Sequence, residues 1–248
     1  MKISIVTVNY GGTDPLVDTL RSIDSQDYTD IESIVVASGL NNQDEKLLKE
    51  RFGVKGRTFI INEDSSLYDA MNIGLNMASG NAIIFMNSGD KFFDFKSCSL
   101  IERYYERSKC LIFRTLQTYE NLRFVRPKLE KLELLSTSPG HQGFVAPLPE
   151  AKGVLFESDS YPVGADFRWM KKLLKLYSGN LNPAIIACFE LGGISNLPSI
   201  KLAKIKLREK NKFQFIKILL KFILFKALGA KRYYVFVYSR KYECTQKL

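Results

Sequence analysis

Residues 62–92 read NEDSSLYDAMNIGLNMASGNAIIFMNSGDKF, and this stretch decides the fold. Apolar and small residues recur at three- and four-residue steps over residues 67–78, which predicts a helix with one buried face. Residues 79–81, Ser-Gly-Asn, end that helix because glycine tolerates the backbone conformation found at helix ends. Residues 82–86 are continuously apolar, as is typical of a strand covered on both faces. The strand stops in the polar loop of residues 87–90, Asn-Ser-Gly-Asp.

The same alternation of strand and helix extends upstream. Residues 3–8, 31–36 and 58–62 are rich in β-branched and apolar side chains, which predicts three earlier strands. Helices are expected between them, and short connections of this kind require a mostly parallel sheet with right-handed crossovers. We therefore expect an α/β fold, with a Rossmann-like, mostly parallel sheet flanked by helices. Ligands of such sheets bind just past the carboxyl ends of the strands, where Asp90 lies.

Further elements are expected downstream. Residues 96–107 predict a helix, residues 110–118 and 185–190 predict strands, and a helix is expected to follow Tyr161 and continue to Leu176. Residues 119–135 show no clear pattern.

The composition changes near residue 200. Beyond it, 14 Lys and Arg residues stand against 2 acidic residues, whereas the whole chain of 248 residues carries a net charge of +10. We expect a main domain over residues 1–200 and a separable, basic, amphipathic helical extension over residues 201–248. No nucleic-acid-binding motif accompanies the charge, so no nucleic-acid partner is expected.

The extension has two possible placements. Lys210, Gln214, Lys217 and Lys221 share one helical face, while Phe215, Ile218, Leu219, Phe222 and Ile223 supply apolar bulk. A basic helix with aromatic residues can lie in the interface of an anionic membrane. The same helix can instead pack on the domain and leave its lysines in water.

The cysteines, the apolar runs and the N-terminus indicate in which compartment the protein is expected. Cys98, Cys110, Cys188 and Cys244 are far apart, so they indicate neither a zinc site nor a disulfide framework and fit a reducing compartment. The sequence contains no run of about 18 uncharged apolar residues, so no transmembrane helix is expected. The N-terminal MKISIVTVNYGG is too short for a signal peptide. A cytoplasmic protein is expected.

The motifs YDAMN-x-G at residues 68–74, A-x-G at 78–80 and NSGD at 87–90 together resemble family 2 inverting glycosyltransferases of the GT-A fold. The likeness is to bacterial members that build capsular, colanic-acid-like or O-antigen polysaccharides. It implies transfer from a nucleotide-sugar donor, with a UDP-sugar favoured, to a hydroxyl of a glycan or lipid-linked acceptor at the inner face of the cell membrane. It also implies that Asp90 holds Mg²⁺ or Mn²⁺ against the donor diphosphate.

The resemblance assigns donor contacts to residues at strand ends and helix starts. They are Thr7, Asn9, Tyr10, Tyr68, Asp69, Asn72, Asn87, Ser88, Gly89, His141 and Gln142. For two of these residues, a purely structural role is the alternative to donor binding. Asp69 can simply be an acid in a first helical turn, which the helix dipole favours, and a single histidine such as His141 is more often structural. Ser65 is expected in the same helix start, with free amides for a ribose or phosphate oxygen.

The resemblance makes Asp166 the general base that deprotonates the acceptor. The alternative is a helix N-cap, a position that Asp favours. The stretch Gly192 to Ser195 resembles the loop that ends the catalytic domain in the family. Ala37 stands where the family has an Asp that contacts the base of the nucleotide. This departure keeps a second hypothesis open, a catalytically weak sugar-nucleotide-binding or membrane-scaffold protein.

Overall fold

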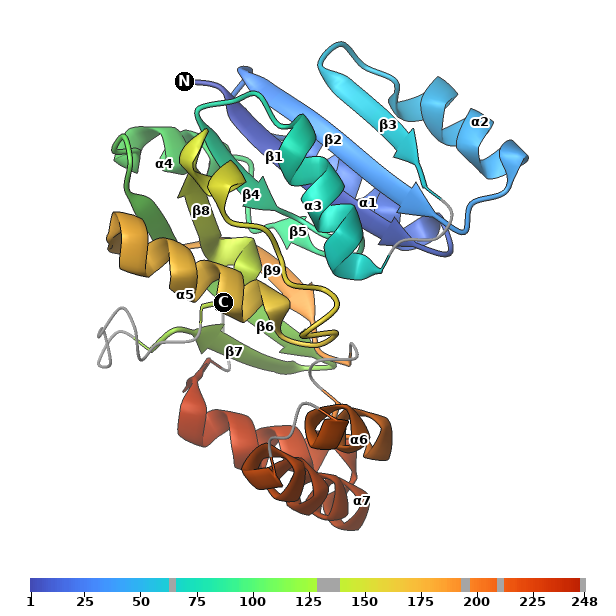
Figure 1. Ribbon diagram of the computed structural model, residues 1–248, viewed down its shortest axis with the longest axis vertical. Coiled ribbons are helices and arrows are strands. Elements are labelled where there is room, and N and C mark those ends of the chain that lie inside the picture. The colour runs from blue at the N-terminus through green and yellow to red at the C-terminus, as the bar shows by residue number, and fades with distance from the viewer. Residues whose placement is uncertain (63–65, 129–138, 193–196, 209–211, 246–248) are drawn as a thin grey trace.

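The computed structural model describes residues 1–62, 66–128, 139–192, 197–208 and 212–245, whose strands form one mixed sheet covered by helices on both faces (Figure 1). The strands are β1 (Ile3–Tyr10), β2 (Ile31–Ser38), β3 (Arg57–Ile61), β4 (Ala82–Phe85), β5 (Lys91–Phe92), β6 (Cys110–Tyr119), β7 (Leu122–Arg126), β8 (Phe144–Pro147), β9 (Gly179–Glu190) and β10 (Glu243–Cys244). The helices are α1 (Asp14–Asp24), α2 (Asn42–Phe52), α3 (Leu67–Met77), α4 (Ser97–Tyr104), α5 (Ala165–Tyr177), α6 (Ile200–Arg208) and α7 (Lys212–Lys241), with short 3-10 turns η2 (His141–Gly143) and η3 (Glu150–Gly153).

The sheet has a parallel half and a mixed half. Its order is β10-β7-β6-β8-β4-β1-β2-β3, with β9 beside β6 and β5 beside β9. The neighbours β3, β2, β1 and β4 are all parallel, whereas β8 runs antiparallel to both β4 and β6. The predicted α/β fold with a largely parallel, helix-flanked sheet is confirmed. Ser65, Lys210 and residues 193–195 lie outside the described residues.

Two apolar layers hold the helices against the sheet. On one face α3 and α5 pack on β1, β4, β6 and β8, and Trp169 of α5 lies against the rings of Phe85, Phe144 and Phe156. On the other face α1, α2 and α4 cover the sheet. In Figure 1, α3 and α5 lie in front of the sheet and α1 lies behind it. These layers leave the carboxyl ends of β1 and β4 uncovered.

Helix α3 lies unusually close to strand β1. A Cβ atom on Gly74 would come within 2.3 Å of Cγ1 of Val6, so only glycine allows this approach. Ser66 caps the helix through the backbone N–H of Asp69, and the Asp69 carboxylate accepts from the backbone N–H of Ser66. The helix therefore begins beside the end of β4, and this places Tyr68 near the candidate site.

One expected boundary differs from the structure. The helix predicted over residues 96–107 ends at Tyr104. The α2 helix is capped by Asn41, whose side chain accepts from the backbone N–H of Asp44 at 2.8 Å.

The end of the C-terminal segment packs on the sheet. Helix α7 bends at Gly229, where φ is +72°, and beyond the bend Tyr234 and Tyr238 are buried against Phe124. Strand β10 then pairs with β7, and Glu243 forms an ion pair with Arg114. Of the two placements considered for the extension, packing on the domain holds for residues 233–244. The boundary at residue 200 stays a prediction.

The first part of α7 presents two different faces. Gln214, Ile218 and Lys221 line a cavity, while Phe213, Ile216, Leu220 and Ile223 point outward and are exposed. Of these four residues, only Ile223 was among the apolar residues expected to matter in the extension. The helical period alone does not show which side of a helix meets the domain. No helix among the described residues has the length and apolar character needed to cross a membrane.

Candidate active site

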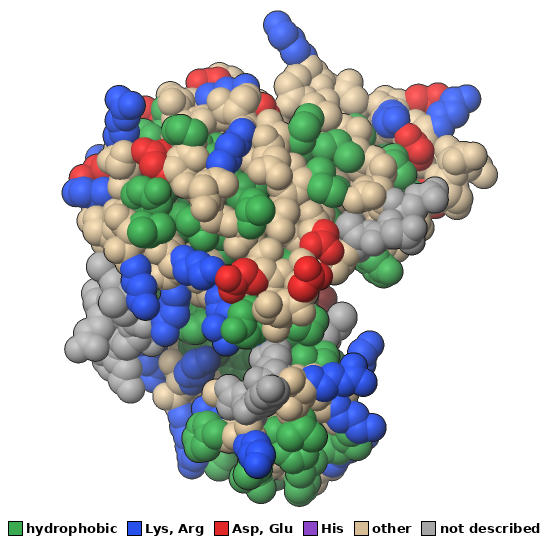
Figure 2. Space-filling model, in the orientation of Figure 1, with side chains coloured by type: hydrophobic (Ala, Val, Ile, Leu, Met, Phe, Trp, Pro, Cys, Tyr) green, Lys and Arg blue, Asp and Glu red, His purple; other side chains and the backbone are tan. Residues whose placement is uncertain are grey.

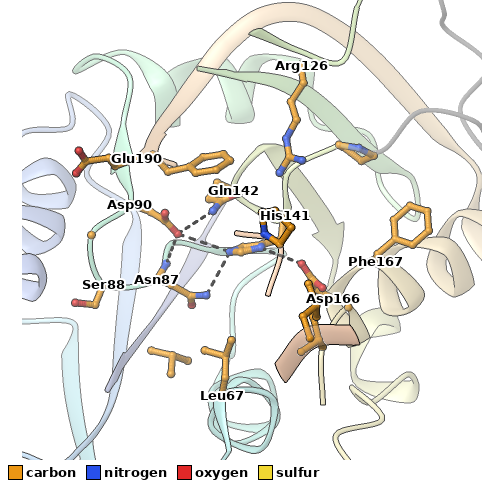
Figure 3. A pocket seen from close by; sticks show the side chains of 18 of the residues that line it. Leu67, Asn87, Ser88, Asp90, Arg126, His141, Gln142, Asp166, Phe167 and Glu190 are labelled. Carbon is orange, nitrogen blue, oxygen red and sulfur yellow. Dashed lines mark hydrogen bonds and ion pairs between the residues drawn. The ribbon is translucent and has the colours of Figure 1, made fainter. Parts of the chain in front are cut away.

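A cavity of about 900 Å³ opens where β1 and β4 end (Figure 3). Asn9, Tyr10 and residues 87–90 line one end of it. Side chains from η2 and α5 lie in the middle, and α6 and α7 form the far wall. The site therefore combines the parallel half of the sheet with the C-terminal segment.

The loop after β4 holds Asp90 in a defined place. Gly89 has a φ of +92°, so the loop turns sharply there, and Asp90 accepts from the backbone N–H of Asn87 at 3.2 Å. The Thr19 hydroxyl donates to the backbone oxygen of Asp90 at 2.7 Å and accepts from the N–H of Gly89 at 2.9 Å. Gln142 Nε2 donates to Asp90 Oδ2 at 3.0 Å. The carboxylate is thus oriented before any ligand arrives.

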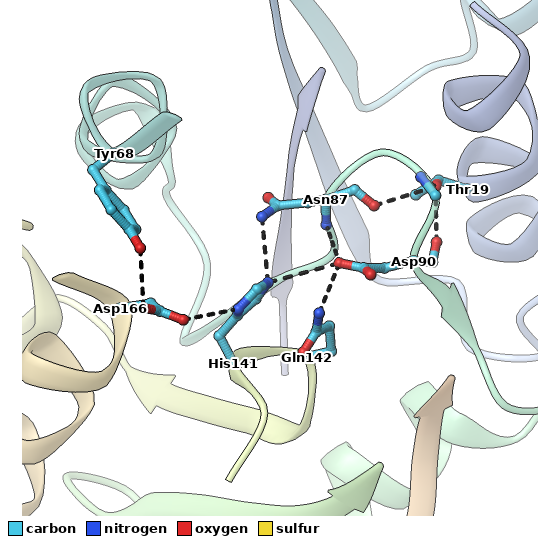
Figure 4. Close-up of polar contacts among 8 residues, drawn as sticks. Thr19, Tyr68, Asn87, Asp90, His141, Gln142 and Asp166 are labelled. Atoms are coloured by element: carbon cyan, nitrogen blue, oxygen red, sulfur yellow. Dashed lines mark hydrogen bonds and ion pairs between the residues drawn. The ribbon is translucent and has the colours of Figure 1, made fainter. Parts of the chain in front are cut away.

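His141 lies between two carboxylates (Figure 4). Its Nδ1 is 3.3 Å from Oδ2 of Asp166, and its Nε2 is 3.7 Å from Oδ2 of Asp90. Burial opposes protonation, but the two carboxylates outweigh it and raise the pKa of His141 to about 9. When Nε2 carries no proton, it can instead accept from Nδ2 of Asn87 at 3.3 Å. The ring therefore links the two acidic ends of the site.

Asp166 faces the cavity from the first turn of α5. The residue before this helix is Gly164, with a φ of +89°, so Gly164 and not Asp166 occupies the N-cap position. The interpretation of Asp166 as a helix cap is therefore wrong. Tyr68 donates to Asp166 Oδ1 at 3.1 Å and accepts from the Gly164 N–H at 2.9 Å. Burial raises the pKa of Asp166, but the hydrogen bond and the charge of His141, together with hydrogen bonds from the Phe167 backbone N–H and from Tyr68, outweigh it, and the net pKa is lowered.

Burial and the Asp166 charge raise the pKa of Tyr68, so its hydroxyl stays a donor. Tyr68 therefore reaches the site through Asp166, and it is not one of the residues that line the cavity.

Two predicted donor-binding residues hold the chain in place instead of lining the cavity. Asp69 accepts from the Ser158 hydroxyl at 2.5 Å, besides its part in the capping of α3. Asn72 exchanges two hydrogen bonds, of 2.9 and 2.8 Å, with the backbone of Phe156. Together they fix the segment that leads to α5. Their assignment to the donor stays a prediction.

The other predicted site residues also divide into those that line the cavity and those that do not. Those that line the cavity are Asn9, Tyr10, Asn87, Ser88, Gly89, Asp90, His141, Gln142 and Asp166. Thr7 is fully buried in β1, and its hydroxyl has no hydrogen-bond partner among the described residues. Tyr10 is 78% exposed at the mouth of the site, whereas Nδ2 of Asn9 donates to the Gly11 backbone oxygen at 2.9 Å.

Sequence reasoning missed Thr19 and Arg126. Thr19 was detectable, because it is a polar residue on the apolar stripe formed by Leu16, Leu20 and Ile23. No sequence feature pointed to Arg126, because residues 119–135, among which it lies, show no clear pattern. It lies at the end of β7 and points toward His141 (Figure 3).

The Asp90 carboxylate and the Asn87 side-chain oxygen are the types of ligand that a magnesium or manganese ion binds. Such ions take carboxylate and amide oxygens, and commonly use one or two carboxylates together with substrate phosphates. Besides the Asp90 carboxylate, Oδ1 of Asn87 is buried without a hydrogen-bond partner among the described residues. In the same part of the chain, no group of three or more His, Cys, Asp or Glu side chains forms a complete metal site. A metal here would therefore depend on oxygens from the substrate.

A stability measurement tests the charge on His141. A raised pKa means that the ring stabilises the metal-free protein fully below pH 6.5, and that this stability is lost as the pH rises through about 9. His141→Gln should remove about 1–3 kcal/mol of pH-dependent stability. Urea unfolding in EDTA at pH 6.5 and pH 9.5 measures it. If the variant loses as much stability as wild type over this interval, His141 is not protonated in the resting protein.

Known proteins resemble this chain in sequence and in fold. The model of the family described as Glycosyl transferase family 2 matches residues 4–164. Glycosyltransferase GlyA of Streptococcus pneumoniae is 34% identical over 90 residues, which cover 36% of this chain. The matched part spans only 13% of that protein.

Several solved structures share the fold. S. aureus TarS 1–349 in complex with UDP-GlcNAc superposes with a TM-score of 0.61 at 16% identity, over 90% of this chain and 72% of that one. Mannosyltransferase PcManGT from Pyrobaculum calidifontis, in complex with GDP-Man and Mn²⁺, gives a TM-score of 0.60 at 13% identity, over 83% of this chain and 60% of that one. At these identities the likeness shows the fold alone.

Proposed function

The chain belongs to glycosyl transferase family 2, and we propose that it is a metal-dependent, inverting glycosyltransferase that uses a nucleotide-sugar donor. The observation that carries the proposal is the chain of contacts Asp90–His141–Asp166 across one cavity. The two carboxylates lie on two sides of the same imidazole, where one would bind the donor diphosphate through a metal ion and the other would accept the proton of the acceptor hydroxyl. Residues 1–200 would form the catalytic domain.

The donor end of the site is the loop after β4. Asp90 and the unpartnered oxygen of Asn87 would hold Mg²⁺ or Mn²⁺. When bound, such an ion supplies positive charge that stabilises the departing nucleotide diphosphate. Asn9 and Tyr10, at the end of β1, would contact the nucleotide. We favour a UDP-sugar, as bound to TarS, although Ala37 removes the carboxylate that the family uses for the base.

Asp166 would remove the proton of the acceptor hydroxyl. His141 lowers its pKa, so the carboxylate is ionised at neutral pH and can accept a proton. Tyr68 holds the other carboxylate oxygen. Attack by the acceptor from the Asp166 side, opposite to the leaving diphosphate, inverts the anomeric carbon. General-base assistance of this kind contributes about 10²–10⁴-fold to the rate.

The outer face of α7 supports a membrane location. Phe213, Ile216, Leu220 and Ile223 are exposed along one stripe, and Phe213 is 73% exposed. Figure 2 shows apolar side chains gathered among Lys and Arg over α6 and α7, at the bottom of the view. An apolar stripe flanked by cations fits the interface of an anionic membrane. We therefore propose a peripheral protein that acts on a glycan or lipid-linked acceptor in bacterial surface-polysaccharide synthesis.

Asp90→Asn should abolish metal-dependent donor binding and leave the fold intact, because the amide keeps the size of the side chain but loses the charge. A calorimetric screen of sugar nucleotides with Mn²⁺ would first identify the donor, and the variant is then titrated with it. Circular dichroism serves as the folding control. Unchanged donor affinity would remove Asp90 from the metal site.

Asp166→Asn should leave donor affinity within a few-fold of wild type and lower kcat by about 10²-fold or more, since a base acts on the chemical step. Release of the nucleoside diphosphate measures turnover. Tyr68→Phe is the matched comparison, because it removes only the hydrogen bond that positions Asp166, and a smaller loss is expected. Donor binding without any turnover in wild type would favour the catalytically weak binding protein.

Replacing Phe213, Ile216, Leu220 and Ile223 together by Ser should weaken binding to phosphatidylglycerol vesicles at least tenfold, because each apolar side chain that leaves water contributes about 1.5–3 kcal/mol. Co-sedimentation measures the binding, which should also fall with salt. Serine at Leu47 and Leu176, two exposed apolar residues elsewhere, is the control and should change nothing. Equal losses in both variants would argue against the α7 stripe.

A further inference from the structure

The far wall of the cavity concentrates positive charge that the proposed chemistry does not use. Arg126 from β7, Lys206 from α6, and Lys221 and Lys241 from α7 all line it. The acids that line the same cavity are Asp90 and Asp166, which contact His141, and the exposed Glu190. Charges of one sign in a walled cavity attract ligands of the opposite sign.

Within the described part of the chain, Arg126 is held by aromatic rings and not by a carboxylate. Its guanidinium lies 5.3 Å from the ring centre of Phe189 and 5.8 Å from that of Tyr242, and Nη1 donates to the Tyr242 hydroxyl at 3.5 Å. Its Nε is buried without a hydrogen-bond partner among the described residues. An arginine oriented in this way presents a planar donor group to an incoming anion.

The two lysines of α7 add to the same field. Lys221 is half-buried, and burial, together with Lys217 and Lys241, lowers its pKa. At Tyr242 burial opposes ionisation, but Arg126 and Lys241 outweigh it and lower the phenol pKa. In the described part of the chain neither lysine forms an ion pair with a carboxylate. Lys221 is partly removed from water without a counter-charge, which is costly, and a bound anion would offset this cost. Lys241 is exposed and adds its charge from the rim.

The lysines of α6 and α7 lie away from the donor end, whereas Arg126 points toward His141, between the two ends of the site. In the sheet, β6 and β8 lie between β7 and β4, the strand that leads to Asp90. Helices α6 and α7 lie beyond β7, away from β1 (Figure 1). Lys206 is tied to the segment just before α5, because its Nζ donates to the Val163 backbone oxygen at 3.0 Å. This contact brings the lysine side of the cavity next to the start of α5, where Asp166 lies.

We propose that Arg126, Lys206, Lys221 and Lys241 form a subsite for a phosphate or diphosphate group of the acceptor, next to Asp166. This inference rests on the proposed function and names the chemical class of its acceptor. Such a group could belong to a lipid-linked sugar or to a soluble sugar phosphate, and both present the same anion. Three elements supply the cations, so α6 and α7 are part of the substrate site.

Titration calorimetry with inorganic pyrophosphate in EDTA tests the subsite on the full chain. Wild type should bind, and Lys221→Gln combined with Lys241→Gln should weaken binding about 100-fold, or about tenfold for each charged hydrogen-bonding partner. Lys221→Arg keeps the charge and should stay within a few-fold of wild type. Lys226→Gln changes an exposed lysine of α7 that does not line the cavity and should have no effect. Circular dichroism checks folding, and Lys241→Gln alone serves if the double variant unfolds.

Three results would overturn the proposal: no binding by wild type, an unchanged affinity in the double variant, or equal losses in the double variant and Lys226→Gln. The EDTA in this titration removes any metal at Asp90, so the donor end holds no metal cation that could bind the pyrophosphate. Because this titration needs neither donor nor turnover, its failure is distinguishable from failure of the glycosyltransferase proposal.

Two further arms identify the source of the phosphate. Polyprenyl phosphate in neutral detergent micelles and glucose 1-phosphate are titrated in the same way. Tighter lysine-dependent binding of the former assigns the group to a lipid-linked acceptor, and equal binding assigns it to soluble phosphates. In transfer assays with a phosphate-bearing acceptor, the double variant should raise the KM of the acceptor and leave that of the donor unchanged. A raised donor KM alone would contradict the acceptor assignment.

Discussion

The imidazole of His141 between Asp90 and Asp166 is the interaction on which the site depends. Two carboxylates that share one cavity repel each other, and burial alone would raise the pKa of Asp166. A protonated ring between them offsets both charges, which raises the pKa of His141 and lowers that of Asp166. The same ring sets the spacing between the proposed donor end and the proposed acceptor end.

The rest of the fold brings these three residues together and keeps them there. Asp90 follows the buried strand β4, and Thr19 of α1 fixes its loop from behind. Asp166 opens α5, where Tyr68 of α3 holds it. Helix α3 can reach this position because Gly74 lets it lie close to β1. Packing on both faces of the sheet thus determines where the acids lie.

The C-terminal segment contacts the domain in two ways. Its aromatic end is anchored on β7 by Tyr234, Tyr238 and the β10 strand. The helix before the bend at Gly229 turns Lys221 toward the cavity and apolar side chains outward. Under the proposals above, such a helix would hold a membrane surface next to the catalytic cavity. These proposed roles would account for a basic segment without a pattern typical of nucleic-acid binding.

Most of the strands and helices of this protein can be predicted from local sequence. Buried strands, the amphipathic helices and the polar loop ending in Asp90 are visible because side-chain periodicity and glycine positions are properties of neighbouring residues. The motifs around Tyr68 and Asp90 sufficed to indicate the family, and those at His141 and Asp166 to propose their roles. Asp69 and Asn72 show the limit of this reasoning, since their side chains bind Ser158 and the backbone of Phe156 instead of lining the cavity.

Only the tertiary structure decided which residues meet. His141 lies 51 residues from Asp90 and 25 from Asp166, and no periodicity links positions so far apart. The same holds for Arg126, which lies between Phe189 and Tyr242, and for the choice of which face of α7 meets the domain. Contacts of this kind depend on how separate elements pack, and the free energy of that packing is shared among many residues. A local pattern can therefore identify the elements, whereas the site arises from their arrangement.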